Sequence, residues 1–200
     1  MSASLKTASL LAALFLLTGC APKQSELPPA AAPFASAAIT LKLNARPDLN
    51  LVNGLANSCT LLLLQGTDEA SLKKTLASPA ALKAFFAGTG ADGEASGAVL
   101  AVDRYVMMPG QSTVLHIDRV MDARYVALVA GYYPFPSDRQ MRIVAVPVEQ
   151  FSRGWWRPER RQRLKPLVLS AVFGARGFVD IKNASGEDLH PTGTEEDTEQ

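Results

Sequence analysis

The sequence has few of the side chains from which catalytic and metal sites are usually built. Its 200 residues include two histidines, His116 and His190, and two cysteines, Cys20 and Cys59. Neither histidine has a second ligand at the spacing of a zinc site, and the chain has no phosphate-binding loop and no dinucleotide fingerprint. The sequence therefore predicts a protein that is not an enzyme and holds no metal or cofactor. A hydrolase is an alternative that would need a carboxylate placed beside His116.

The sequence also lacks a strong charge and a second long apolar run. The net charge is +1, so no overall field draws the chain to nucleic acid. After Cys20, no apolar stretch approaches the roughly 18 residues that span a bilayer. With 48% hydrophobic and 20% charged residues, the composition predicts one globular domain with a sizeable core. Neither nucleic acid nor a small-molecule substrate is expected as a partner.

Residues 1–19 have the three parts of a secretory signal: a lysine, a short apolar core and small residues before a candidate cut. The tetrapeptide LTGC, which ends at Cys20, resembles the bacterial lipobox. In that class a diacylglyceryl group is attached to the cysteine sulfur, the signal is cut just before the cysteine, and the new amine is acylated. We therefore expect a lipid anchor on Cys20. A disulfide between Cys20 and Cys59 is the alternative.

Two segments flank the expected domain. Residues 20–38 form the acylated N-terminus and a tether rich in Pro, Ala and Ser, which predicts a flexible or extended spacer. Alanine and not aspartate follows Cys20. This favours the outer membrane, with the domain facing the periplasm. Residues 184–200 contain six acidic side chains and no Lys or Arg, which predicts a solvated, disordered tail.

The remaining residues, 39–183, show the patterning of a β-sandwich. The stretch 39–45 alternates apolar and polar residues, and 59–66 is apolar on both faces, as in a central strand. Residues 67–90 switch to a helical period that Pro79 interrupts, with Ser78 as a cap. Further strands are expected within 99–110, 112–118, 124–136 and 142–148 and, as two strands or a hairpin, within 165–183. The prediction is a mostly β, antiparallel sandwich of about eight strands, with a helical insertion between strands two and three.

The loop that joins the first two strands, Arg46 to Asn57, carries apolar side chains where no core partner is evident. These side chains are Leu49, Leu51, Val52 and Leu55. Exposed apolar clusters often mark interaction sites, so the loop is a candidate partner-binding site. The alternative is that two or more of these side chains fold back over the end of the sandwich.

A basic stretch, Ser152 to Lys165, contains six basic residues, one glutamate and the pair Trp155-Trp156. The plainest interpretation is a solvated loop between strands with one tryptophan in the core. Because Trp and Arg are common binding anchors, a protein contact or a contact with anionic headgroups is the alternative. Stacking on nucleic acid is a third possibility.

The order of these features resembles one known family. A lipobox and a Pro/Ala tether are followed by "DRYVMMPGQSTVLHI" and "RYVALVAGYY", that is, a strand, the turn Pro109-Gly110, a strand, and a further strand from Tyr125 to Tyr133. The order resembles the TssJ family, the outer-membrane lipoproteins of bacterial type VI secretion systems, over about Ile39 to Ile181. The acidic tail and the stretch near Trp155 depart from the family pattern.

The resemblance implies a transthyretin-like sandwich with added helices and a protein without enzymatic activity. It also implies binding to the periplasmic C-terminal region of the inner-membrane protein TssM, in a trans-envelope complex that includes TssL. The family's loop between the first two strands contributes to that contact, which here corresponds by position to Arg46 to Asn57. A periplasmic ligand-binding or chaperone-like sandwich lipoprotein is the alternative function, and a deep apolar pocket would favour it.

Overall fold

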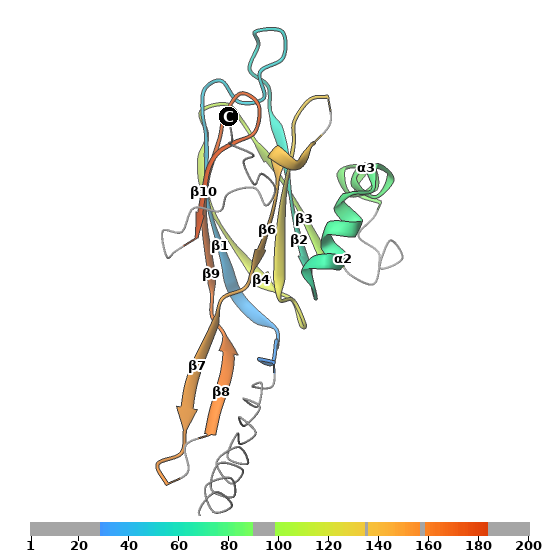
Figure 1. Cartoon of the computed structure of the whole chain (residues 1–200). Coiled ribbons are helices and arrows are strands. Elements are labelled where there is room, and N and C mark those ends of the chain that lie inside the picture. The colour runs from blue at the N-terminus through green and yellow to red at the C-terminus, as the bar shows by residue number, and fades with distance from the viewer. Residues whose placement is uncertain (1–28, 90–98, 135, 157–158, 184–200) are drawn as a thin grey trace, which may run out of the picture.

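The computed structural model describes residues 29–89, 99–134, 136–156 and 159–183. Eight strands form two sheets that pack face to face, and two helices lie on the outer face of one sheet (Figure 1). The expected mostly β sandwich, with a helical insertion between the second and third strands, is confirmed. The predicted signal, Cys20, the tether up to residue 28 and the acidic tail lie outside the described residues.

Each sheet of the sandwich has four strands. The first sheet has the order β10 (Phe178–Asn183), β9 (Leu167–Phe173), β1 (Ala35–Ala45) and β4 (Ser112–Arg119). The second sheet has the order β3 (Val99–Met107), β2 (Cys59–Gly66), β5 (Tyr125–Gly131) and β6 (Met141–Ala145). The predicted central position of the apolar strand is confirmed, because β2 pairs with β3 on one side and with β5 on the other.

One pairing departs from the antiparallel expectation. β1 pairs with β4 antiparallel but with β9 parallel, in a register that places Ile39 beside Leu167. The apolar patterns of β1 and β9 are compatible with either direction, since both directions bury alternate side chains. Strand direction here depends on where the long excursion before β9 returns to the sheet, which local patterning does not show.

Two further strands form a hairpin of their own, so the structure describes ten strands where about eight were expected. β7 (Val148–Arg153) pairs antiparallel with β8 (Glu159–Leu164) in a separate two-stranded sheet. The expected inter-strand loop is therefore wrong for most of this segment. The expected tryptophan in the core is also wrong, because Trp155 is 92% exposed and Trp156 is 78% exposed.

The folded part begins before the predicted boundary at residue 39. β1 starts at Ala35, and Ala30 and Ala32 are already buried. Ala31 forms an isolated parallel bridge with Arg163 of β8. The last part of the expected tether thus lies against the domain, because short alanine side chains pack there without a period that the sequence would show.

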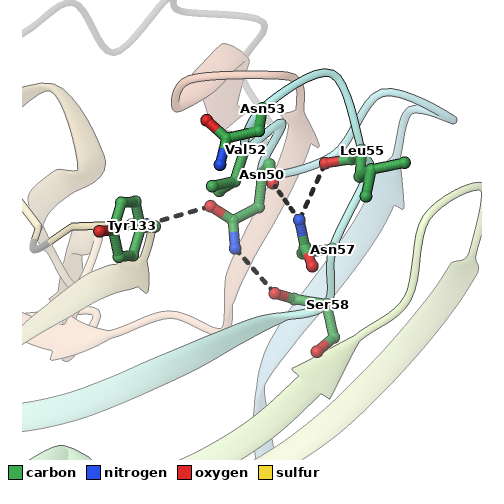
Figure 2. A pocket seen from close by; sticks show the side chains of 7 residues that line it. All are labelled: Asn50, Val52, Asn53, Leu55, Asn57, Ser58 and Tyr133. Carbon is green, nitrogen blue, oxygen red and sulfur yellow. Dashed lines mark hydrogen bonds between the residues drawn. The ribbon is translucent and has the colours of Figure 1, made fainter.

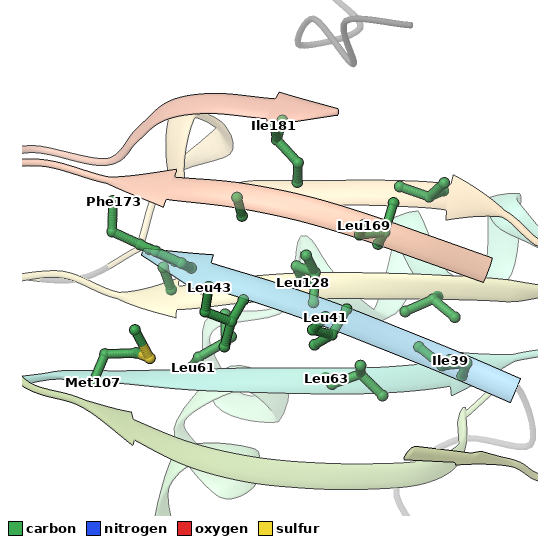
Figure 3. Close-up of a cluster of buried hydrophobic side chains, with 14 of the residues drawn as sticks. Ile39, Leu41, Leu43, Leu61, Leu63, Met107, Leu128, Leu169, Phe173 and Ile181 are labelled. Atoms are coloured by element: carbon green, nitrogen blue, oxygen red, sulfur yellow. The ribbon is translucent and has the colours of Figure 1, made fainter. Parts of the chain in front are cut away.

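The core between the two sheets consists of alternate side chains from both (Figure 3). β1 contributes Ile39, Leu41 and Leu43, and β2 contributes Leu61 and Leu63, all at most 2% exposed. Burial of one such side chain stabilises the fold by about 1.5–3 kcal/mol. The sandwich interior is therefore filled by hydrocarbon, as the alternation in the sequence predicts.

The other face of β2 packs against the two helices. Leu62 and Leu64 of β2 form a second cluster with residues of α2 (Glu69–Leu76) and α3 (Pro79–Ala87), among them Leu72 and Phe85. The predicted break at Pro79 is confirmed. The Ser78 side chain accepts a hydrogen bond from the Ala81 backbone N–H, and proline takes the first turn, where its missing donor costs nothing. No helix among the described residues is long and apolar enough to cross a membrane.

The sandwich has two ends, each named here by the element that lies there. β1 runs from the hairpin end, where the β7–β8 hairpin projects, to the loop end, where the β1–β2 loop lies (Figure 1). A short 3-10 helix, η2 (Asp138–Gln140), precedes β6. The two surfaces that sequence analysis singled out therefore lie at opposite ends of the sandwich.

Candidate functional site

The β1–β2 loop is fastened along one side to the turn between β9 and β10. Three backbone N–H groups of the loop donate to carbonyls there: Arg46 to Phe173 at 2.8 Å, Asn50 to Gly174 at 3.2 Å and Leu51 to Ala175 at 3.0 Å. The adjacent turn between β3 and β4 is joined to the loop as well, because Gly110 N–H donates to the Arg46 carbonyl at 3.2 Å. The loop is thus held in one conformation although it is long and irregular.

The tip of the loop is a small hairpin. Val52 and Leu55 exchange two backbone hydrogen bonds, each of 2.9 Å, across Asn53 and Gly54. Both turn residues have positive φ, 51° for Asn53 and 80° for Gly54. This is the combination that a type I′ turn requires, and Asn-Gly is its preferred sequence. The dipeptide was therefore a readable signal that sequence analysis missed.

Asn50 joins the loop to the body of the sandwich (Figure 2). Its side chain is 7% exposed; the amide nitrogen donates to the Ser58 carbonyl at 2.9 Å, and the amide oxygen accepts from the Tyr133 N–H at 3.0 Å. Asn57 completes the frame, since its side chain donates to the carbonyls of Leu55 and Asn50 at 2.8 and 3.3 Å. Buried amides with both ends bonded fix a backbone in place.

The structure separates the four apolar loop residues that were proposed to bind a partner. Leu49 is fully buried and belongs to the main core, so it is a packing residue, against the expectation that placed it on the contact surface. Leu51 is 44% exposed and Leu55 is 71% exposed, while Val52 is half-buried. Leu49 thus folds back over the core, whereas Leu51 and Leu55 face solvent, and partner binding by the loop stays a prediction for these exposed residues.

Two aromatic and apolar side chains from neighbouring turns extend this exposed surface. Tyr133, which follows β5, is 71% exposed, and Met108, in the turn after β3, is 55% exposed. We call Leu51, Leu55, Met108 and Tyr133 the loop-end surface. Sequence analysis did not find Met108 or Tyr133 as site residues, because their proximity to the loop arises from the fold.

An open hollow of about 470 Å³ lies between the loop and Tyr133 (Figure 2). It is lined by Val52, Leu55 and Tyr133 and by the polar side chains of Asn50, Asn53, Asn57 and Ser58. The lining offers hydrocarbon, an aromatic face and amide groups, which suits a protruding side chain and nearby backbone of another protein. Among the described residues, no group of three or more His, Cys, Asp or Glu could hold a metal ion.

Tyr132 fixes the β9–β10 turn, to which the β1–β2 loop is hydrogen-bonded. Its ring is 4% exposed, and its hydroxyl lies 3.0 Å from the Gly174 carbonyl and 3.1 Å from the Gly177 carbonyl, either of which can accept its proton. Burial raises the pKa of this hydroxyl, so it stays a donor at any physiological pH. Tyr132 and Tyr133 face opposite sides, as neighbours in an extended chain do, and only Tyr132 is in the core.

The remaining reactive side chains lie away from the loop-end surface or are inert. His116 is a surface histidine: it is exposed on the edge strand β4, where its Nδ1 lies 3.3 Å from the Thr40 hydroxyl. Cys59 is a buried free thiol. Burial raises its pKa to about 12, which keeps the sulfur protonated and unreactive at neutral pH.

Comparisons with known proteins agree with this architecture. The family model described as "Type VI secretion lipoprotein, VasD, EvfM, TssJ, VC_A0113" matches residues 37–166. The structure is similar to the type VI secretion lipoprotein TssJ1 from Pseudomonas aeruginosa, with a TM-score of 0.50, 19% identity and coverage of 76% of this chain and 96% of that chain. It is also similar to Serratia marcescens Lip, a membrane-bound component of the type VI secretion system, with a TM-score of 0.51, 19% identity and coverage of 73% and 96%. No curated protein matches the chain by sequence.

Proposed function

Since the chain belongs to the type VI secretion lipoprotein family, whose model covers residues 37–166, we propose that it anchors a type VI secretion trans-envelope complex to the outer membrane. In this role it has no enzymatic activity. It faces the periplasm and binds the periplasmic C-terminal region of TssM, in a complex that includes TssL. The filled core of the sandwich supports a docking role over the alternative of a ligand-binding or chaperone-like sandwich.

The anchor in this proposal is the lipid on Cys20. The lipobox-like LTGC motif supports it, because acylation there would leave several fatty chains at the start of the mature protein. Each buried methylene contributes about 0.8 kcal/mol, so one chain holds a protein only marginally and several chains hold it firmly. The sandwich would then be tethered by its hairpin end, from which residue 29 leads back toward Cys20.

The partner contact in this proposal is the loop-end surface. The observation that carries it is the exposure of Leu55, 71%, on a loop that hydrogen bonds hold in one conformation. An exposed apolar side chain on a rigid support binds with little loss of conformational entropy, so its burial translates into affinity. Tyr133 lines the same hollow as Leu55, and Leu51 and Met108 add exposed apolar area at this end; aromatic side chains often dominate interface energies.

The test is capture of the purified periplasmic C-terminal region of TssM by the Leu55→Arg variant. We expect the Kd to rise at least tenfold, which is a loss of about 1.4 kcal/mol or more of binding free energy. The reason is that a charged guanidinium replaces an apolar side chain that the partner would bury. The matched control is Met121→Arg, since Met121 is 64% exposed and lies in the β4–β5 turn at the hairpin end. Equal affinity of both variants and the unsubstituted protein would remove the loop-end surface from the contact.

The anchor is tested separately by the intact mass of the purified protein and by cell fractionation of Cys20→Ser. We expect the mass of a chain that begins at Cys20 and carries acyl groups, and we expect the variant to leave the outer-membrane fraction. An unmodified Cys20 in the native protein would contradict the anchor. Full effector export by the variant would contradict the need for it.

A further inference from the structure

The β7–β8 hairpin is firmly based in the sandwich but free along most of its length. At its base, Leu164 packs against the main core, and Lys165 N–H donates to the Pro147 carbonyl at 2.8 Å. The backbone of Arg163 forms an isolated β-bridge with that of Ala31. Beyond the base, the two strands pair only with each other and project from the body (Figure 1). A two-stranded ribbon in water is marginally stable, so its projecting part is expected to gain stability from something it contacts.

The projecting end carries both tryptophans of the chain in contact with each other. The ring centroids of Trp155 and Trp156 are 5.4 Å apart in an edge-to-face arrangement, with 92% and 78% of their surfaces exposed. Large exposed aromatic side chains on a projecting turn leave a substantial apolar surface in water. Indole rings combine an apolar body with one N–H donor, and they are enriched where hydrocarbon meets water at the membrane interface.

The sides of the hairpin are basic. Its two acidic side chains are already paired: Glu149 with Arg163 and Glu159 with Arg161, each at 2.9 Å. Such exposed pairs cancel charge but contribute little stability. Among the described residues of the hairpin, Arg153 and Arg160 are exposed and make no ion pair, so they leave a net positive charge near the two indoles.

This basic, aromatic hairpin lies at the same end as the segment that leads to Cys20. The segment enters the domain beside β8, through the bridge of Ala31 to Arg163. Two more exposed apolar side chains lie at this end: Phe34, 55% exposed just before β1, and Met121, 64% exposed. Their turns are joined by a hydrogen bond from the Asp122 N–H to the Ala32 carbonyl at 2.7 Å. The proposed acyl anchor would therefore bring this end, and not the loop end, toward the membrane.

We propose that the β7–β8 hairpin is a second membrane contact, which inserts Trp155 and Trp156 into the interface of a leaflet containing anionic phospholipid. Arg153 and Arg160 then lie at the level of the phosphates. This proposal rests on the proposed function, because acylation of Cys20 supplies the proximity. Anionic lipid is favoured over a protein partner by the unpaired positive charge and by the shared end with the anchoring segment. The contact fixes the orientation of the domain on the membrane, which attachment at a single residue does not.

Intrinsic fluorescence tests the proposal directly, because Trp155 and Trp156 are the only tryptophans in the chain. The full-length protein, purified as cells produce it, is reconstituted into vesicles of phosphatidylethanolamine and phosphatidylglycerol, and separately into vesicles of phosphatidylcholine alone. In the anionic vesicles we expect emission to shift to shorter wavelength, quenching by aqueous acrylamide to fall, and quenching by brominated lipid to appear. In phosphatidylcholine, or at high salt, these changes should be smaller, since screening weakens the attraction of the basic side chains.

Two double variants assign the effect to the hairpin. Arg153→Gln with Arg160→Gln should lose most of the emission shift in anionic vesicles. The matched control, Lys74→Gln with Lys83→Gln, removes the same charge from exposed positions on α2 and α3 and should behave like the unsubstituted protein. Trp155→Phe and Trp156→Phe each leave one reporter, which shows how far each indole enters.

Two results would overturn the proposal. One is an emission maximum that is the same in both vesicles with no quenching by brominated lipid. The other is a shift that needs the TssM region or high protein density in place of lipid, which would make the hairpin a protein interface. The intact mass of the same sample reports acylation independently. Protein that proves to be unacylated is added to preformed vesicles and scored by the same emission, so failure of the anchor and failure of the hairpin contact are distinguishable.

Discussion

At the scale of single residues, Asn50 determines the geometry of the candidate partner site. It combines three features that few side chains allow together: φ of 45°, near-complete burial, and hydrogen bonds from both ends of its amide. Asparagine tolerates the left-handed region better than other residues with a side chain, because its short polar group bonds locally. Its partners, Ser58 and Tyr133, lie at the start of β2 and after β5, so Asn50 positions the loop relative to both.

We predict that Asn50→Ala lowers the free energy of unfolding by about 2–4 kcal/mol, because two part-buried backbone groups lose their partners and alanine must adopt a positive φ. The measurement is urea unfolding, monitored by the far-ultraviolet circular dichroism of the backbone. The matched control is Asn53→Ala, since Asn53 also has positive φ, 51°, but is exposed. The control carries the backbone cost alone and should lose about 1 kcal/mol. Equal losses in the two variants would mean that the side-chain hydrogen bonds of Asn50 contribute nothing to the free energy of unfolding.

A second prediction at this scale concerns Cys59 and alkaline pH. Burial raises the pKa of its thiol from 9.0 to about 12, so between these values the unfolded chain releases a proton that the folded chain keeps. The stability from this group is complete below pH 9 and is lost as pH rises toward 12. Between pH 8 and pH 10 we expect the unsubstituted protein to lose about 1 kcal/mol more than Cys59→Ala. Parallel pH profiles of the two proteins would contradict this.

At the scale of elements, the docking of α3 on the second sheet depends on a close approach. A Cβ atom at Gly131 would lie 2.7 Å from Cε1 of Phe86 and 3.1 Å from the Thr60 carbonyl oxygen. Glycine at this position of β5 therefore lets the aromatic ring lie directly on the strand.

We predict that Gly131→Ala lowers the free energy of unfolding by about 1–3 kcal/mol, as overpacking does in other cores. The Phe86→Leu background should remove much of that loss, because the smaller side chain leaves room for the added methyl group. A double-mutant cycle measured by denaturant unfolding gives the coupling between the two positions. Strictly additive losses would show that the added methyl group at position 131 does not clash with the Phe86 ring.

The elements that could be predicted from the sequence are those with a long local pattern. The apolar run of β2, the alternation of β1 and the period of the two helices were readable, and Ser78 and Pro79 marked the break between the helices. The β7–β8 hairpin was missed, because Arg-rich segments are poor strand candidates and its pairs, such as Glu149 with Arg163, are cross-strand contacts. The loop site was found only in part. Leu49 and Leu51 lie two residues apart in an irregular segment, and no period indicates which of them is buried.

At the scale of the whole molecule, the arrangement separates the two proposed contacts. The loop-end surface and the β7–β8 hairpin lie at opposite ends of the sandwich (Figure 1). A protein of this shape can engage a membrane through one end while the other end stays open to solvent. The helices α2 and α3 lie along the side of the second sheet and obstruct neither end.

We predict that the protein reconstituted into anionic vesicles binds the periplasmic C-terminal region of TssM with the same Kd, within about a factor of three, as the detergent-purified protein, an energy difference of at most roughly 0.7 kcal/mol. The reason is that the membrane-facing end and the partner-facing end do not overlap. Flotation with labelled TssM region measures the binding, and reconstituted Leu55→Arg gives the background. Loss of binding on reconstitution would place the partner contact at the hairpin end.

The parallel pairing of β1 with β9 has a consequence for pulling forces in such an assembly. β1 spans 11 residues from the hairpin end to the loop, with one register irregularity between Ala35 and Ile39, and it pairs with β9 from Ile39 to Ala45. Tension between the bilayer and a captured partner would therefore travel along a single covalent backbone. The ladders to β4 and β9 on its two sides would be loaded in shear, with all their hydrogen bonds sharing the load at once, whereas a peeled edge strand loses them one after another.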